Sequence, residues 1–119
     1  METLLALTYK GGVLIVADSA AARSIVVMKH GEDKTRDLTK FCTMAFSGEP
    51  GDAVQFAEFI QRNIKLNEIR TGLTMTPSAI ANYTRRELAD SLRSRVCIIY
   101  LNILCASYGS QANYIKVSV

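Results

Sequence analysis

The side chains best suited to nucleophilic or metal chemistry in this 119-residue chain are three cysteines and a single histidine. A catalytic thiol needs an activating base, and His30 lies in a polar segment that we predict to be a loop. Cys42, Cys97 and Cys105 form no C-x-x-C pair, and each lies in an apolar run. We therefore expect buried, reduced thiols rather than a nucleophile, a disulfide framework or a metal site.

Composition predicts one globular domain over residues 1–119, with a modest core. Hydrophobic residues make up 49% of the chain and charged residues 21%, which is ordinary for a folded protein. The net charge is only +3. The densest basic group, Arg85, Arg86, Arg93 and Arg95, is spaced along a predicted helix. This spacing favours a solvated or partner-facing helix surface over a nucleic-acid site.

No targeting or membrane-spanning segment is expected. Met1-Glu2 begins with an acidic residue rather than the basic start of a signal peptide. The longest apolar stretch, residues 96–106, is interrupted by Asn102 and is too short to cross a bilayer.

Strand-forming runs at both ends of the chain flank two helices. We predict strands over residues 4–9, 13–17, 25–28, 35–38, 41–46, 96–108 and 113–119. Lys10-Gly11-Gly12 predicts a hairpin between the first two, with the glycines at positive φ. Because no βαβ repeat occurs, the order predicts an α+β fold: antiparallel β-sheets with helices packed on one face.

The two helices are predicted from apolar residues that recur every three or four positions. The first runs from about Asp52 to Gly72, and the second follows Thr76-Pro77, an N-cap and a first-turn proline. The inner stripes are Ala53, Phe56, Ala57, Ile60 and Ile64 in the first helix, and Ile80, Tyr83, Thr84, Leu88 and Leu92 in the second. Arg85, Arg86, Glu87 and Asp90 fall mostly on the outer side of the second helix.

Two segments have long and distinctive sequences: residues 48–61, GEPGDAVQFAEFIQ, and residues 85–95, RRELADSLRSR. Both resemble one non-catalytic type of proteasome β subunit, a member of the N-terminal nucleophile hydrolase superfamily. Weaker similarity runs over residues 4–38 and 101–104, and little remains after Tyr108. The resemblance implies an αββα sandwich, here incomplete because the C-terminal part is shortened or altered.

The resemblance also implies which residues correspond to the catalytic centre of active relatives. There, an N-terminal threonine attacks the peptide bond and its own α-amine acts as the base. Asp18 and Lys34 match the aspartate and lysine that tune that centre, but Glu2 falls at the nucleophile position. Self-cleaving relatives use a Gly-Thr junction, whereas Thr3 follows Glu2 and lies one residue out of register. We expect no catalytic residue and no propeptide before Met1.

We interpret Asp18 as a turn-forming side chain, and Lys34 as a structural ion-pair partner or a solvated residue. The chain is expected to be a non-catalytic subunit of the 20S proteasome core β ring, without a cofactor or metal, in the cytoplasm and nucleus. Its implied partners are other proteasome α and β subunits, with no nucleic acid and no membrane. Two alternatives stay open: a threonine endopeptidase with Thr3 exposed by trimming, and a truncated variant that does not assemble.

Overall fold

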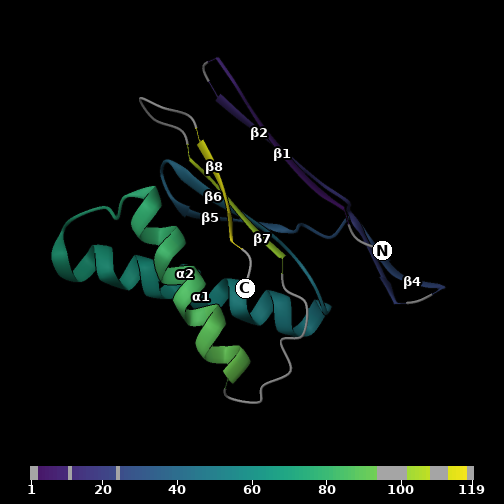
Figure 1. Cartoon of the computed structure of the whole chain (residues 1–119). Coiled ribbons are helices and arrows are strands. Elements are labelled where there is room, and N and C mark those ends of the chain that lie inside the picture. The colour runs from purple at the N-terminus through teal and green to yellow at the C-terminus, as the bar shows by residue number, and fades with distance from the viewer. Residues whose placement is uncertain (1–2, 11, 24, 94–101, 108–112, 118–119) are drawn as a thin grey trace.

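The computed structural model describes residues 3–10, 12–23, 25–93, 102–107 and 113–117. The elements are β1 Leu4–Tyr9, β2 Gly12–Ala17, β3 Ala20–Arg23, β4 Val26–His30, β5 Thr35–Thr39, β6 Cys42–Ser47, α1 Pro50–Thr71, α2 Pro77–Arg93, β7 Asn102–Ser107 and β8 Asn113–Val117 (Figure 1). Every strand pair in this part of the chain is antiparallel. The predicted α+β class is confirmed.

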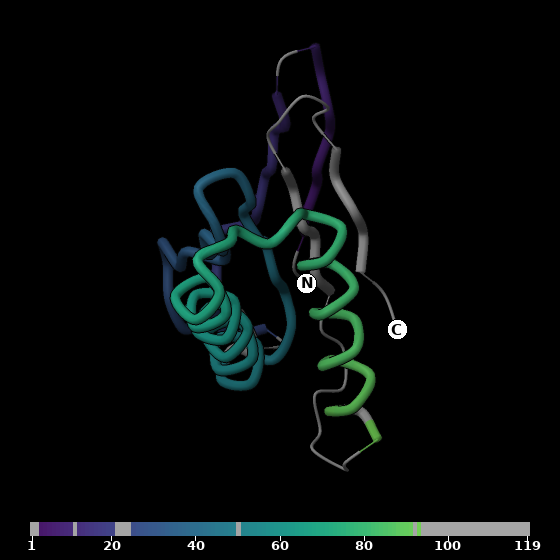
Figure 2. The backbone as a smooth tube through the Cα atoms, turned by 90° about the vertical axis from the view of Figure 1, so that its left-hand side faces the viewer, coloured from purple at the N-terminus to yellow at the C-terminus, as the bar shows by residue number. Residues whose placement is uncertain are grey.

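A four-stranded sheet in the order β5-β6-β7-β8 forms the centre of the molecule. Helix α1 lies along β5 and β6, and α2 lies along β7 and β8, so both helices cover the same face, as predicted. The β1-β2 hairpin contacts β6, β7 and β8 from the other side (Figures 1 and 2). The result is a layer of helices, a central sheet and a partial second β layer.

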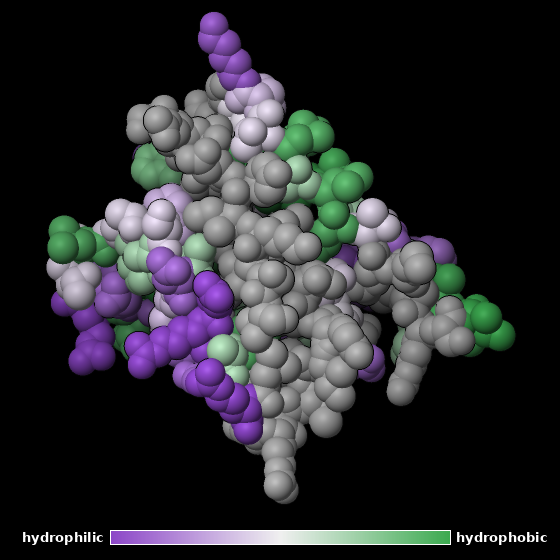
Figure 3. Space-filling view, in the orientation of Figure 1, coloured by the Kyte–Doolittle hydropathy of each residue, from purple (hydrophilic) through white to green (hydrophobic). Residues whose placement is uncertain are grey.

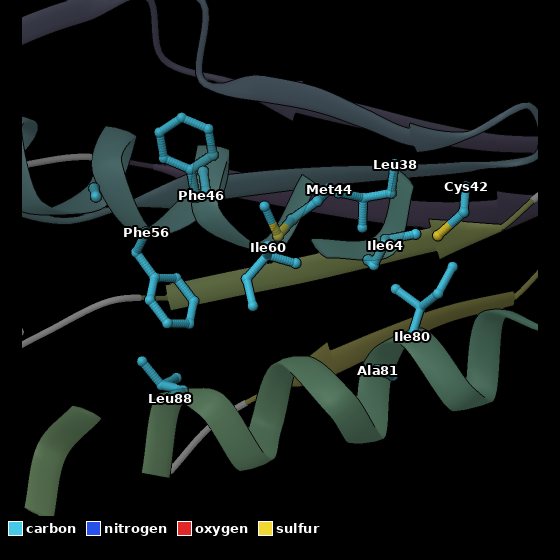
Figure 4. Close-up of a cluster of buried hydrophobic side chains, with 12 residues drawn as sticks. Leu38, Cys42, Met44, Phe46, Phe56, Ile60, Ile64, Ile80, Ala81 and Leu88 are labelled. Carbon is cyan, nitrogen blue, oxygen red and sulfur yellow. The ribbon is translucent and has the colours of Figure 1, made fainter. Parts of the chain in front are cut away.

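The hydrophobic core lies between the two helices and the central sheet (Figure 4). All five residues of the predicted α1 stripe are buried. On α2, Ile80, Thr84 and Leu88 are buried and Tyr83 is half-buried, while the side chain of Leu92 lies outside the described residues. Thr84 is tolerated there because its hydroxyl donates a hydrogen bond of 2.8 Å to the Ile80 carbonyl.

The helix ends agree closely with their sequence signals. α1 begins at Pro50, two residues before the predicted Asp52, because proline suits the first turn. It ends at Gly72, whose φ of 69° requires the left-handed conformation that glycine adopts without a steric penalty. Thr76 caps α2, since its hydroxyl accepts a hydrogen bond of 3.3 Å from the Ala79 N–H. Neither described helix has an apolar stretch long enough to cross a membrane.

The first hairpin forms as predicted, but the glycine argument was wrong for Gly12. Gly12 is the first residue of β2 and is not among the glycines with positive φ, and Gly11 lies outside the described residues. A Cβ on Gly12 would come within 2.6 Å of the Tyr9 hydroxyl oxygen, which is the far end of an exposed side chain, so a larger residue there would require Tyr9 to change its position.

The structure also corrects the segment that follows β2. Residues Ala20–Arg23 form β3, which the sequence analysis missed because alanine is a weak strand former. They pair with β4, which extends to His30. The predicted loop therefore begins at Gly31, whose φ is 75°, and not at Lys29.

Candidate functional site

Three segments meet where the catalytic centre of active relatives is expected: the start of β1, the link between β2 and β3, and the start of β5. The β1-β2 register pairs Leu4 with Ala17, which places Thr3 beside Asp18. The Asp18 N–H donates a hydrogen bond of 3.1 Å to the Thr3 carbonyl. Glu2, the residue at the nucleophile position, lies outside the described residues.

Asp18 acts as a turn residue, as the sequence analysis proposed. One oxygen of its carboxylate, Oδ1, accepts a hydrogen bond of 3.0 Å from the Ala20 N–H, two residues further along the chain. This bond is the side-chain-to-backbone pattern of an Asx-turn, formed in the two-residue link between β2 and β3. The side chain thus satisfies a backbone donor at the point where β3 begins.

Lys34 is buried, with only 4% of its surface exposed, so the solvated alternative was wrong. Its ammonium group Nζ donates a hydrogen bond of 3.0 Å to the Ala20 carbonyl. Its own carbonyl accepts a hydrogen bond of 3.0 Å from the Phe46 N–H in β6. Burial of an ammonium group is costly without such partners. Hydrogen bonds from both the side chain and the backbone therefore hold Lys34 in place.

Asp18 and Lys34 therefore both form hydrogen bonds with the backbone of the same residue. Asp18 accepts from the N–H of Ala20, and Lys34 donates to the carbonyl of the same residue. We call this arrangement the Ala20 clamp. Asp18 and Lys34 can be recognised from the sequence, whereas Ala20 cannot, because a residue that acts only through its backbone leaves no side-chain signal.

A small hollow lies beside the clamp. Its volume is about 10 Å³, which is roughly the space needed by one water molecule. The hollow is lined by Glu32, Lys34, Phe46, Ser47, Gly48, Ala53 and Val54.

The cysteine and histidine candidates do not form a site in the described part of the chain. Cys42 is buried in the core, and burial raises the pKa of its thiol to about 11, so it stays protonated and unreactive near neutral pH. His30 is an exposed strand residue in β4. Cys97 and the side chain of Cys105 lie outside the described residues.

The Ala20 clamp predicts how substitutions of Asp18 change the stability of the fold. We expect Asp18→Ala to lower the free energy of unfolding by about 1 kcal/mol, because the Ala20 N–H loses its acceptor. Asp18→Asn should retain most of the stability, since the amide oxygen can accept the same bond. Urea unfolding followed by pulse proteolysis would measure both. An equal loss in the two variants would show that the charge, and not the hydrogen bond, is what matters.

A helix layer, a four-stranded antiparallel sheet and a partial second β layer give an α+β architecture consistent with the proteasome fold. The family model described as proteasome subunit matches residues 1–115. The chain therefore belongs to the proteasome subunit family, which includes both catalytic and non-catalytic β subunits.

Named relatives agree with this assignment. A probable proteasome subunit beta type-4 of Neurospora crassa is 53% identical over 95 residues, covering 80% of this chain and 47% of that protein. Proteasome subunit beta type-4 of Saccharomyces cerevisiae is 40% identical, covering 95% and 57% respectively. Proteasome subunit beta type-2 of Dictyostelium discoideum is 46% identical, covering 93% and 55%. The chain thus spans about half the length of these relatives.

Proposed function

We propose that this chain is a non-catalytic subunit of the β ring of the 20S proteasome core. The observation that carries the proposal is Glu2, which occupies the nucleophile position in the sequence register. A carboxylate has no hydroxyl to attack a peptide carbonyl. Thr3 lies one residue away, and a misplacement of only about 1 Å can already reduce a rate by about 100-fold.

The surroundings of Asp18 and Lys34 support the same proposal. Both side chains bind the backbone of Ala20, so each has a structural role that does not require a nucleophile. A structural role of this kind is compatible with a chain that carries no nucleophile.

In this role the chain would act by its shape. It would hold catalytic neighbours in place and help to enclose the chamber in which their threonines cut proteins, within ATP- and ubiquitin-dependent degradation. Its partners would be α-ring subunits on one side, β subunits laterally, and β subunits of the facing ring. We place it in the cytoplasm and nucleus with the rest of the core particle.

The test combines assembly with covalent labelling. We expect an epitope-tagged chain to co-migrate with core particles on a native gel, to retain Met1 or Glu2 by intact-mass analysis, and to stay unlabelled by a threonine-directed epoxyketone. Catalytic subunits in the same particles provide the positive control for labelling. A chain that begins at Thr3 and becomes labelled there would be a peptidase. A chain absent from the core band would be a variant that does not assemble.

A further inference from the structure

The β3-β4 hairpin stands apart from the rest of the molecule. Its two strands form a sheet of their own, and β4 lies at the end of the molecule far from the α1-α2 connection (Figure 1). β3 and β4 make their substantial contacts with each other and not with the other described elements. An isolated two-stranded ribbon is only marginally stable in water, so a hairpin of this kind needs further support.

The hairpin is apolar at its outer end. Ile25 is 95% exposed, and Val26, Val27 and Met28 are also exposed. Figure 3 shows hydrophobic surface at the end of the molecule where Figure 1 places β4. Successive side chains of a strand point to opposite faces, so exposure of both Val26 and Val27 means that both faces of the ribbon are uncovered among the described residues. Such a ribbon buries its apolar surface best by entering a groove.

The base of the hairpin is fixed. The Ala20 clamp holds its first residue through Asp18 and Lys34. At the other side of the base, the Glu32 N–H donates a hydrogen bond of 2.9 Å to the Ser19 carbonyl. Because both ends of the ribbon are tied to β2 and β5, its direction is set before a partner binds, and less conformational entropy is lost on binding.

The charged residues of the hairpin indicate what kind of surface it would bind. The segment from residue 20 to residue 31 contains Arg23 and Lys29 and no acidic residue. Two copies of the hairpin side by side would bring like charges together, which opposes self-association. An apolar ribbon with basic flanks is instead complementary to an apolar groove bordered by carboxylates.

We propose that the β3-β4 hairpin is an assembly arm that inserts into an apolar, acid-bordered groove on another subunit of the particle, and that the Ala20 clamp aims it. This inference rests on the proposed function and adds to it a specific contact surface. It also gives Asp18 and Lys34 a role in assembly: they orient the arm through the backbone of Ala20.

Photo-crosslinking in the assembled particle tests the proposal directly. A photo-crosslinking amino acid would replace Ile25 in an epitope-tagged chain, and mass spectrometry would identify the crosslinked peptide in gradient-purified particles. We expect a peptide of a different subunit that contains apolar residues close to Asp or Glu. A crosslink only to this chain itself, or to a second copy of it, would overturn the proposal. So would a peptide without nearby acidic residues.

Paired variants test the apolar and basic requirements separately, in competition with the untagged parental chain. Ile25→Asp should be under-represented in core particles by at least about tenfold, whereas Ile25→Leu should assemble normally. Lys29→Glu should be depleted and Lys29→Arg should not. Because Ile25 is almost fully exposed, its substitution removes little packing within the described residues. The amount of unassembled variant chain should therefore equal that of the unassembled parental chain.

The outcomes separate this inference from the proposed function. If the parental chain does not enter core particles, the proposed function fails and the arm fails with it. If the parental chain assembles and the Ile25→Asp variant assembles equally well, the hairpin is not an assembly arm and the proposed function stands.

Discussion

Replacing Ile60 with alanine is expected to lower the free energy of unfolding by about 2–5 kcal/mol. Ile60 is fully buried on the inner face of α1, where it lies beside Met44 of β6 (Figure 4). The substitution removes apolar contacts and leaves a cavity that the helix and sheet cannot close completely. Because α1 is the element that covers β5 and β6, the loss should affect cooperative unfolding of the whole core.

The same helix supplies a matched control. Ile69 has the same side chain but is 70% exposed, so Ile69→Ala should change the free energy of unfolding by no more than about 0.5 kcal/mol. Urea unfolding followed by pulse proteolysis measures both variants at low protein concentration, which limits association through exposed apolar strands. Equal effects of the two substitutions would show that α1 does not pack on the sheet in the orientation described.

Stability is expected to fall as the pH rises from 8 to 11, and the buried thiol of Cys42 should account for about 2 kcal/mol of the fall. Burial raises the pKa of this thiol from 9.0 to about 11. The unfolded chain therefore loses the proton first, which favours unfolding above pH 9. The contribution of the thiol is complete below the unfolded pKa and is lost as the pH approaches the folded one.

Cys42→Ala isolates this effect, because the other titrating groups remain in both proteins. At pH 8 the variant should be less stable than the parent by the lost packing of the sulfur. As the pH rises toward 11, this difference should shrink and then reverse, by about 2 kcal/mol in total. Unfolding free energies measured at several pH values test the expectation. A difference that does not change with pH would mean that the thiol titrates normally and is not shielded from water.

Most of the local structure follows from short-range patterns of residues. The α1 stripe, the Gly72 terminus and the Thr76 cap were predicted because helix periodicity and capping depend on residues three or four positions apart. The β1-β2 hairpin was also predicted, because its two strands are adjacent in the chain. The family was indicated by residues 48–61 and 85–95, and the family model confirms it.

The way in which these elements combine around the candidate site depends on contacts between segments that are far apart in the chain. The order β5-β6-β7-β8 joins strands separated by both helices, and no local pattern specifies such pairing. Solvation was one alternative for Lys34 because lysine is rarely buried, yet its side chain is buried and its ammonium group donates a hydrogen bond to the carbonyl of Ala20, 14 residues away in the chain. β3 was missed because its alanines have little strand preference and form a strand only through pairing with β4. Patterns between neighbouring residues can be recognised in the sequence. The burial of a side chain and its hydrogen bonds to the backbone depend on segments that meet only after the chain has folded.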